Sequence, residues 1–386
     1  MPAGGRRPRR GDRGDEVTGS QPGLADDPSS PPLLEIRDLA VTFAGRIGLL
    51  SGLLGRAGSE ARAVDGVNLE VRRGEVLALA GESGCGKTTI ARTVLGLIKP
   101  KRGQILFEGK PLGRNLQAYR RRVQMVFQDP TGSLNPRQTI YEIVAEGLRI
   151  HRIHRGPAGE SEEQLVARAL SRSGLRPPER FFMLYPHELS GGQRQRVVIA
   201  GALVLEPELI VADEPVSSLD ASVRGEILSL LLKLRDEMQI SILIVTHDLG
   251  LAWTVADRVA VMYLGRIVET GAAEEVLLRP LHPYTRALLD VVPEPGGIDR
   301  PFLTGEPPDP TNVPTGCRFH PRCPRIADQT AASLGVEGRC LGEDLGLVEL
   351  RPGHLAACHV ATLDPDAATG GGAPSVEAAG PEASRS

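Results

Sequence analysis

Apolar and polar residues alternate along the first part of the chain in the way that half-buried β-strands require. The alternation runs from Leu34 to Phe43 and resumes over Val67–Val71. Strands with one face on a core and one face in water show this period of two. Residues 104–107 and 123–127 predict two further strands.

Later parts of the chain carry short, continuous apolar runs instead of alternation. Val76–Ala80, Leu209–Ala212 and Ser241–Thr246 are typical of strands that are buried on both faces. Segments with helical spacing lie between these runs, at residues 87–97, 140–150, 162–172, 189–203 and 223–234. Strands that alternate with helices predict an α/β fold with a largely parallel sheet, and ligands at the carboxyl ends of its strands.

The two ends and one internal stretch have a different composition. Residues 1–32 and 363–386 are rich in small and polar residues, so we expect a disordered leader and a disordered low-complexity tail. Residues 45–62 form an insertion between two predicted strands. It is either a surface loop or an apolar segment that touches a membrane partner. A length of 386 residues predicts one large domain with an appendage.

Charge and hydropathy exclude some classes of function. The net charge of -3 argues against nucleic acid as the main partner. No stretch approaches the roughly 18 to 20 apolar residues of a membrane span. No apolar segment follows the arginine pairs near the N-terminus, so a secretion signal is not predicted. We therefore expect a cytoplasmic protein with reduced cysteines.

The first buried strand leads into a glycine-rich loop that fits G-x-x-x-x-G-K-[ST]. A strand, such a loop and a helix together point backbone N–H groups at a polyphosphate. Lys87 is expected to reach the β- and γ-phosphates, and the Thr88 hydroxyl to bind Mg²⁺. Cys85 precedes the helix N-terminus, which predicts a lowered thiol pKa. The candidate nucleotide-binding residues are Gly81, Glu82, Ser83, Gly84, Cys85, Gly86, Lys87, Thr88 and Thr89.

Polar residues stand directly after the later strands, where a parallel sheet places its ligands. Asp213 follows a buried strand and is expected to reach Mg²⁺ through water. Glu214 is positioned to orient or deprotonate an attacking water. Gln128 and His247 follow two other strands. In isolation, an acidic turn would explain Asp213 and Glu214 equally well, and a solvated or hydrogen-bonded bystander would explain His247 better. The upstream phosphate loop reverses this and favours catalysis.

Leu189-Ser190-Gly191-Gly192-Gln193 adds a specific signature. Together with the phosphate loop, Gln128, Asp213-Glu214, residues 217–220 and His247, all in order, it resembles the ATP-binding cassette of ABC transporters. The resemblance implies a P-loop NTPase cassette over residues 33–272. It would contain a parallel-sheet core, an antiparallel β subdomain and a helical subdomain at about residues 129–205.

In that family, two cassettes enclose two ATP molecules, and each nucleotide contacts both chains. The resemblance implies that Ser190, Gly191, Gly192 and Gln193 contact the ATP of the second cassette, a sister subunit or a second copy. It places Asp220 in the D-loop, Gln128 in the Mg²⁺ shell and His247 on the γ-phosphate. Phe43 falls where the family often stacks an aromatic ring on adenine.

Two further stretches resemble the peptide-permease cassettes, namely residues 132–137 and 282–289. They imply the ATPase subunit of a di- or oligopeptide importer at the cytoplasmic face of the membrane. Two membrane-spanning permease subunits and an extracytoplasmic solute-binding protein would complete the importer. The alternatives are an importer cassette for nickel or another small solute, and a soluble ABC ATPase acting in DNA repair or translation. A single cassette without a heptad run favours the importer.

Four of the five cysteines lie in the appendage, residues 273–362, namely Cys317, Cys323, Cys340 and Cys358. This region is rich in Pro, Gly and Arg and has few apolar residues to bury, so we expect a cross-link that stabilises its structure. Three alternatives stay open, a [4Fe–4S] cluster, zinc, and independent buried thiols. We expect a structural role, because the site lies far in sequence from the ATP motifs. Neighbouring arginines are expected to offset anionic thiolates, namely Arg318, Arg322, Arg325 and Arg339.

Overall fold

A computed structural model describes residues 31–44, 60–290 and 305–369 of the chain. The predicted leader, nearly all of the 45–62 insertion and most of the low-complexity tail lie outside the described residues. The described residues from Pro32 onward form one compact unit.

The central element is an eight-stranded sheet in the order β11-β12-β10-β9-β3-β8-β7-β6. Its five strands from β9 to β6 are parallel to one another, as the sequence predicts. Every residue of β3, β7 and β8 is buried, which explains why polar residues occur only at the ends of these strands. The parallel strands are β6 (Val123–Val126), β7 (Leu209–Asp213), β8 (Ser241–Thr246), β3 (Val76–Ala80) and β9 (Arg258–Tyr263).

A second, antiparallel sheet has the order β2-β1-β4-β5. The alternation of its first strand puts Ile36, Leu39 and Val41 into a core that also holds Leu77 of β3 and Ile90 of the helix after the phosphate loop. The two sheets therefore share a core beside that loop. The strands are β1 (Leu34–Ala44), β2 (Glu60–Val71), β4 (Arg102–Phe107) and β5 (Lys110–Pro111).

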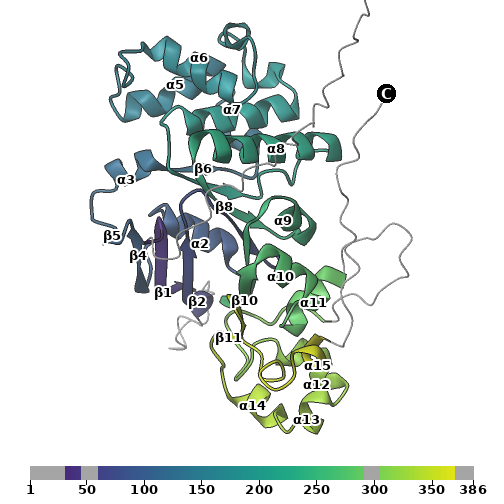
Figure 1. The fold of residues 1–386 in the computed structure, drawn as a ribbon. Helices are drawn as coiled ribbons and strands as arrows, with labels where there is room; N and C mark the ends of the chain where they lie inside the picture. The colour runs from purple at the N-terminus through teal and green to yellow at the C-terminus, as the bar shows by residue number, and fades with distance from the viewer. Residues whose placement is uncertain (1–30, 45–59, 291–304, 370–386) are drawn as a thin grey trace, which may run out of the picture. The chain divides into compact units, whose positions relative to one another are not determined.

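Some helices pack on the main sheet, and others pack mainly on one another. The second set, here called the helical group, contains α5, α6 and α7. Thr139 and Ser161 begin two helices of this group with capping boxes, which satisfy backbone N–H groups of the first turn. Figure 1 shows α5, α6 and α7 side by side. The helices up to residue 255 are α2 (Lys87–Val94), α3 (Gln117–Arg122), α4 (Pro130–Ser133), α5 (Ile140–Ile150), α6 (Glu162–Arg172), α7 (Gly191–Leu203), α8 (Ala221–Met238) and α9 (Leu249–Val255).

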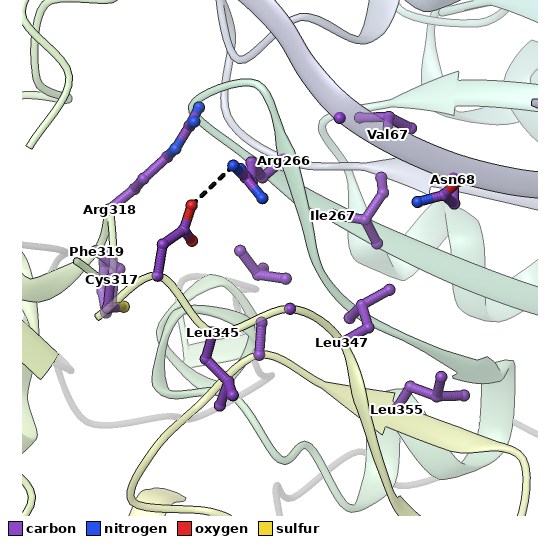
Figure 2. Close-up of a pocket in the computed structure, with 15 residues that line it drawn as sticks. Val67, Asn68, Arg266, Ile267, Cys317, Arg318, Phe319, Leu345, Leu347 and Leu355 are labelled. Carbon is purple, nitrogen blue, oxygen red and sulfur yellow. Dashed lines mark ion pairs between the residues drawn. The ribbon is translucent and has the colours of Figure 1, made fainter. Parts of the chain in front are cut away.

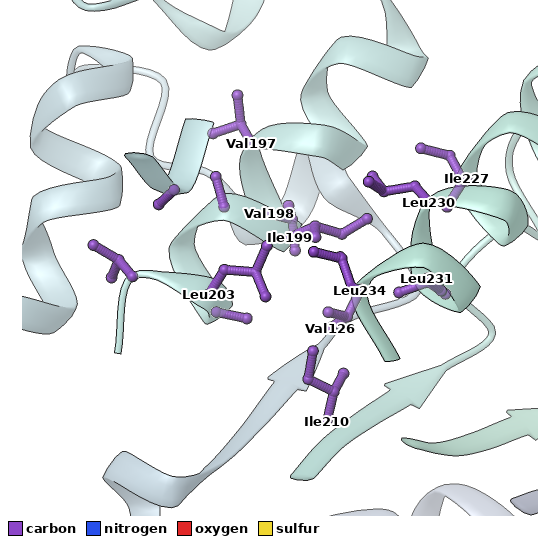
Figure 3. Packing of buried hydrophobic residues seen from close by; sticks show 14 of the residues in the cluster. Val126, Val197, Val198, Ile199, Leu203, Ile210, Ile227, Leu230, Leu231 and Leu234 are labelled. Carbon is purple, nitrogen blue, oxygen red and sulfur yellow. The ribbon is translucent and has the colours of Figure 1, made fainter. Parts of the chain in front are cut away.

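The helical group is joined to the sheet by a continuous apolar core. Figure 3 shows Ile199 and Leu203 of α7 and Leu231 and Leu234 of α8 gathered over Val126 and Ile210 of strands β6 and β7. Because α7 begins with the signature sequence, this packing sets the orientation of that sequence relative to the strand ends.

The C-terminal region continues the main sheet, which the sequence did not predict. Strand β10 (Arg266–Ala272) pairs with β12 (His354–Ala356), and β12 pairs with β11 (Val348–Arg351). The buried carboxylate of Glu269 accepts hydrogen bonds from the backbone N–H groups of Leu281 and His282 at 2.7 and 2.9 Å. It also lies 2.7 Å from Nε2 of His354. This buried cluster ties three segments of the region together.

The expectation that this region has little to bury is wrong. Phe319 is 1% exposed and packs with Tyr263 and Tyr284 against the strands, while Ala331, Val336 and Val360 form a further small core. Order also continues past residue 362 into a short helix. The helices of the region are α10 (Ala273–Leu278), α11 (Pro283–Asp290), α12 (Pro324–Ala327), α13 (Thr330–Ser333), α14 (Glu337–Gly342) and α15 (Pro365–Thr369). Among the described residues, no helix is long and apolar enough to cross a membrane.

Candidate active site

The glycine-rich loop connects β3 to α2, and its glycines are required by close backbone contacts. Gly81 and Gly86 have φ angles of 150° and 114°. A Cβ at Gly81 would lie 2.2 Å from the Met262 carbonyl oxygen, and one at Gly86 would lie 2.1 Å from that of Ala63. Both distances are impossible for a side chain, so the loop is built around residues without a Cβ.

Lys87 is buried, and its ammonium group lies across the loop. Its Nζ donates to the carbonyl oxygens of Gly81 at 2.7 Å and Glu82 at 2.9 Å. The sulfur of Cys85 lies 3.8 Å from this nitrogen. A polyphosphate in the loop would offer the ammonium group stronger, charged acceptors.

Two oxygen ligands lie together beside the loop. The Thr88 hydroxyl donates to Oδ1 of Asp213 at 3.1 Å. Asp213 is 5% exposed, and burial raises the pKa of its carboxyl group, with the nearby charge of Glu214 acting in the same direction. A carboxylate and a hydroxyl are suitable Mg²⁺ ligands, and a cation here would stabilise the ionised Asp213.

Three strand ends meet at Glu214. Its Oε2 accepts a hydrogen bond from Nε2 of Gln128 at 2.9 Å, and its Oε1 lies 2.9 Å from Nδ1 of His247. These residues follow β6, β7 and β8, so the parallel sheet brings them to one edge. Glu214 has a φ of 47°, and its N–H donates to the Val245 carbonyl. A cavity of about 60 Å³ beside Glu214 and His247 has room for water.

The signature sequence forms the start of α7. The Ser190 hydroxyl accepts from the Gln193 N–H at 3.2 Å, and the Gln193 side chain accepts from the Ser190 N–H at 3.0 Å. Ser190 and Gly191 are exposed. A Cβ at Gly192 would lie 2.7 Å from Val223 of α8, so this glycine permits close packing. Asp220 caps α8 by accepting from the Val223 N–H at 3.0 Å.

Phe43 lies on the strand next to the loop. It is 44% exposed and pairs with Ala61 of β2. Ala63, two residues further along β2, is the residue whose carbonyl touches Gly86. The Phe43 ring is therefore partly exposed on β1, the strand that pairs with β2.

The expected lowering of the Cys85 pKa is wrong. Cys85 is 6% exposed. Burial raises the pKa of its thiol, and the nearby Lys87 charge opposes this effect only in part. The neutral thiol is therefore the favoured form, and Cys85 serves as a small buried residue.

The C-terminal region contacts the phosphate loop directly, which the sequence did not predict. The guanidinium of Arg322 forms a bidentate ion pair with Glu82, at 2.8 and 3.0 Å. The Tyr284 hydroxyl accepts from the Glu82 N–H at 2.9 Å. The region is thus far from the ATP motifs in sequence but in direct contact with their loop in the structure.

The four arginines near the cysteines are engaged with carboxylates. Arg318 pairs with Asp65 and donates to the Leu264 carbonyl at 2.6 Å. The remaining pairs are Arg322 with Glu82, Arg325 with Asp328 and Arg339 with Glu343. Each arginine is thus paired with a carboxylate. The charges of Arg325 and Arg339 still oppose, in the expected direction, the rise in pKa that burial causes at Cys323 and Cys340.

The four tail cysteines converge although they are far apart in sequence. Cys317, Cys323, Cys340 and Cys358 line one cavity of about 10 Å³, and none forms a disulfide. Burial raises the pKa of Cys317 to about 12 and that of Cys323 to about 11. Within the described residues, no group of three or more His, Cys, Asp or Glu side chains is arranged to hold a single metal ion.

A larger cavity of about 360 Å³ shares Cys317 and Phe319 with the cysteine cavity (Figure 2). It is lined by apolar residues of β10, β12 and the preceding loop, among them Ile267, Leu347 and Leu355. Arg266 and Asp344 form an ion pair of 2.7 Å at its edge. No residue of the phosphate loop lines this cavity, so it is separate from the candidate active site.

Sequence comparisons agree with this geometry. The profile of the ABC transporter family matches residues 64–217, and that of the oligopeptide/dipeptide transporter C-terminal region matches residues 268–329. A putative peptide import ATP-binding protein of Brucella ovis is 44% identical over 334 residues, covering 85% of this chain and 97% of that protein. The oligopeptide transport ATP-binding protein AppF of Bacillus subtilis is 42% identical with the same coverage. OppF of Escherichia coli is 45% identical, covering 79% of this chain and 92% of its own.

Solved structures support the fold. The chain is similar to cbiO1 of Clostridium perfringens, part of the ABC transporter complex cbiONQ, with a TM-score of 0.54 and 33% identity over 64% of this chain and 90% of that one. It is also similar to the dimeric ATP-binding cassette MJ0796 bound to ADP and Pi, with a TM-score of 0.53 and 29% identity over 62% and 98%. The predicted P-loop ABC cassette fold is thus confirmed. The chain belongs to the ABC transporter family, among the ATP-binding proteins that carry the oligopeptide/dipeptide transporter C-terminal region.

Proposed function

We propose that this chain is the ATP-hydrolysing subunit of an ABC importer for di- or oligopeptides. The convergence of Gln128 and His247 on Glu214, beside the phosphate loop, carries the proposal. The names of the relatives, which are peptide and oligopeptide import proteins, support the class of solute. They favour peptides over nickel, and import over DNA repair or translation.

The reaction is hydrolysis of MgATP to ADP and phosphate. The loop amides and Lys87 bind the polyphosphate, with Lys87 turning from the loop carbonyls to the phosphates. Thr88, Asp213 and Gln128 would hold Mg²⁺, which balances phosphate charge. Glu214 takes a proton from a water molecule, and the oxygen of that water attacks the γ-phosphorus. The bond between the γ-phosphorus and the bridging oxygen breaks, and ADP leaves with that oxygen.

His247 contributes by position and by hydrogen bonding. An ionised Glu214 can only accept, so Nδ1 of His247 carries the proton in their 2.9 Å contact. This contact orients the imidazole beside the cavity for water. The side chain of His247 is 52% exposed, so its ring can reach a γ-phosphate at the edge of the sheet.

We propose that the complete site needs a second cassette. Ser190 and Gly191 are exposed at the N-terminus of a thirteen-residue helix. Exposed amides at a helix N-terminus favour an anion, and Gly192 and Gln193 complete this turn. Asp220 is exposed at the start of α8, next to the signature through Val223. A similar cassette is dimeric with ADP and Pi bound, which supports a dimer for this chain. In that dimer we expect each signature to face the other chain's nucleotide.

Membrane-spanning permease subunits and an extracytoplasmic solute-binding protein are proposed partners, and the chain would lie at the cytoplasmic face of the membrane. Exposed apolar side chains flank the helical group and offer a docking surface, notably Phe127 at 44% and Met183 at 76% exposure. Phe127 precedes Gln128, which donates a hydrogen bond to Glu214. A partner that docks at Phe127 would therefore affect the position of Glu214.

Reconstitution tests the proposed function. The chain is co-expressed with candidate permease subunits, placed in liposomes and supplied with a candidate peptide-binding protein. We expect ATP-dependent uptake of a labelled tripeptide that Lys87→Ala abolishes. Uptake of Ni²⁺ without peptide uptake would contradict the peptide assignment, and a chain that binds no permease subunit would contradict import.

We further infer that the four tail cysteines hold a [4Fe–4S] cluster with a structural role. Four convergent thiols match its ligand set, and the close Cys pairs of structural zinc sites are missing. Bound as thiolates, they would cross-link the segments around α12 and α14. The test is anaerobic purification followed by a visible spectrum with iron and zinc analysis. Zinc without iron, or neither metal in a folded chain, would contradict the cluster.

A further inference from the structure

We propose that Arg322 and Tyr284 of the C-terminal region position the phosphate loop through Glu82, and thereby set the affinity for nucleotide. This proposal rests on the proposed function, because it concerns ATP binding to the same loop. It makes Arg322 and Tyr284 positioning residues, which act on the nucleotide through another residue.

The ion pair is well defined and largely withdrawn from solvent. The side chain of Arg322 is 5% exposed and that of Glu82 is 24% exposed. Both nitrogens of the guanidinium fork meet both carboxylate oxygens, at 2.8 and 3.0 Å. Bidentate pairs of this kind fix orientation as well as distance. Arg322 also lies 3.5 Å from the Tyr263 hydroxyl, which limits its movement.

Both the backbone N–H and the backbone carbonyl of Glu82 form hydrogen bonds. Its N–H donates to the hydroxyl of Tyr284, which is fully buried against Tyr263 with 4.6 Å between ring centroids. Its carbonyl accepts from Lys87 at 2.9 Å. Glu82 thus joins the C-terminal region to the lysine that would bind phosphate. The conformation of the loop at its entry depends on both contacts.

The charges of Glu82 and Arg322 predict the direction in which Arg322 changes nucleotide affinity. Glu82 places a carboxylate inside a loop whose ligand is a polyphosphate, and the charges of the two repel each other. Arg322 balances the charge of that carboxylate and fixes its orientation. Without Arg322, the carboxylate is left uncompensated near the phosphates, so nucleotide affinity should fall. Removing the carboxylate as well should restore much of it.

The segment that carries Arg322 is itself anchored at several points. Its ends, Cys317 and Cys323, line the cysteine cavity. Between them, Arg318 holds Asp65 of β2 and the Leu264 carbonyl, and Phe319 packs against Tyr284 at 5.3 Å between centroids. The C-terminal region therefore presents Arg322 on a fixed support.

The test is a double-mutant cycle on nucleotide binding by the full chain. The dissociation constant for a non-hydrolysable MgATP analogue is measured for wild type, Arg322→Ala, Glu82→Gln and the double variant. Tyr284→Phe and Arg339→Ala are measured in parallel. Arg339 pairs with Glu343 at the surface of the same region and serves as the matched control.

We expect Arg322→Ala to weaken binding about tenfold, and Glu82→Gln to restore most of that loss in the double variant. Tyr284→Phe should weaken binding without removing charge, and Arg339→Ala should leave it unchanged. A lower melting temperature for Arg322→Ala, with an unchanged dissociation constant and no rescue, would overturn the proposal. If Arg322→Ala does not fold, Arg322→Lys, which lacks the bidentate fork, replaces it in the cycle. Wild type that binds no nucleotide would instead contradict the proposed function.

Discussion

Nδ1 of His247 lies 2.9 Å from Oε1 of Glu214, and this contact connects the ends of two neighbouring strands. The other carboxylate oxygen of Glu214 accepts from Gln128. Both oxygens are therefore oriented by side chains before any nucleotide arrives. A base that is preorganised in this way needs little rearrangement when water and γ-phosphate enter.

Glu214→Gln should remove most turnover while preserving nucleotide binding. The amide keeps the shape of the side chain but cannot accept the proton of water, which should reduce steady-state hydrolysis about 10² to 10⁴-fold. The variant is also expected to accumulate as an ATP-bound dimer, visible by size-exclusion chromatography. Glu226→Gln, on the exposed face of α8, is the control and should leave hydrolysis unchanged. Turnover of Glu214→Gln within a few-fold of wild type would exclude Glu214 as the base.

Asp213→Asn should stabilise the protein without Mg²⁺ and abolish its response to MgATP. Burial holds the pKa of Asp213 above its ordinary value, so ionisation costs folding free energy. This cost is absent below the ordinary pKa of aspartate and fully present above the raised one. At pH 7.5 the neutral variant should therefore melt at a higher temperature than wild type. A lower melting temperature, or an intact MgATP-dependent shift, would contradict the placement of Asp213.

Cys85 should resist alkylation in the folded protein. Its raised pKa and its burial keep the thiol neutral and covered near pH 7, so modification should be slow and should accelerate as pH rises. Any chain that is modified should lose nucleotide binding, because the sulfur lies 3.8 Å from Nζ of Lys87. The measurement is peptide mass spectrometry after treatment with iodoacetamide, with and without guanidinium. Equal rates in folded and unfolded protein would contradict the buried position.

Phe319→Ala should destabilise the chain, because the C-terminal region is packed onto the sheet. The side chain is 1% exposed between Tyr263 and Tyr284, and such a truncation costs about 3 to 5 kcal/mol. Leu363→Ala, at a position that is 57% exposed, is the control and should change stability by less than about 0.5 kcal/mol. Thermal unfolding and limited proteolysis follow both. A Phe319→Ala variant as stable as the control would show that the region does not depend on this core.

The parts of the molecule that the sequence predicted are those specified by local pattern. Val76–Ala80 and Ser241–Thr246 form buried parallel strands because no polar side chain interrupts them. Gln128, Glu214 and His247 follow β6, β7 and β8. Because these three strands are parallel, the residues meet at one edge of the sheet, which was predictable from their order.

The C-terminal region was less predictable because its structure depends on contacts far away in sequence. Strand β12 has only three residues and gains its order from β10. The contact of Arg322 with Glu82 spans 240 residues, and no local pattern indicates it. Burial of Phe319 and Val360 likewise depends on neighbours from distant segments. The pKa of Cys85 was mispredicted because the helix N-terminus was considered without the desolvation that dominates there.

The most direct test of the central claim is whether peptide drives ATP hydrolysis in the assembled importer. The chain, its permease partners and a second cassette are reconstituted in liposomes, and phosphate release is measured with and without peptide-loaded binding protein. We predict that the loaded binding protein raises hydrolysis several-fold and that Glu214→Gln abolishes both the basal and the stimulated rate. Hydrolysis that is indifferent to permease subunits and peptide, or that persists in the Glu214→Gln importer, would contradict the account.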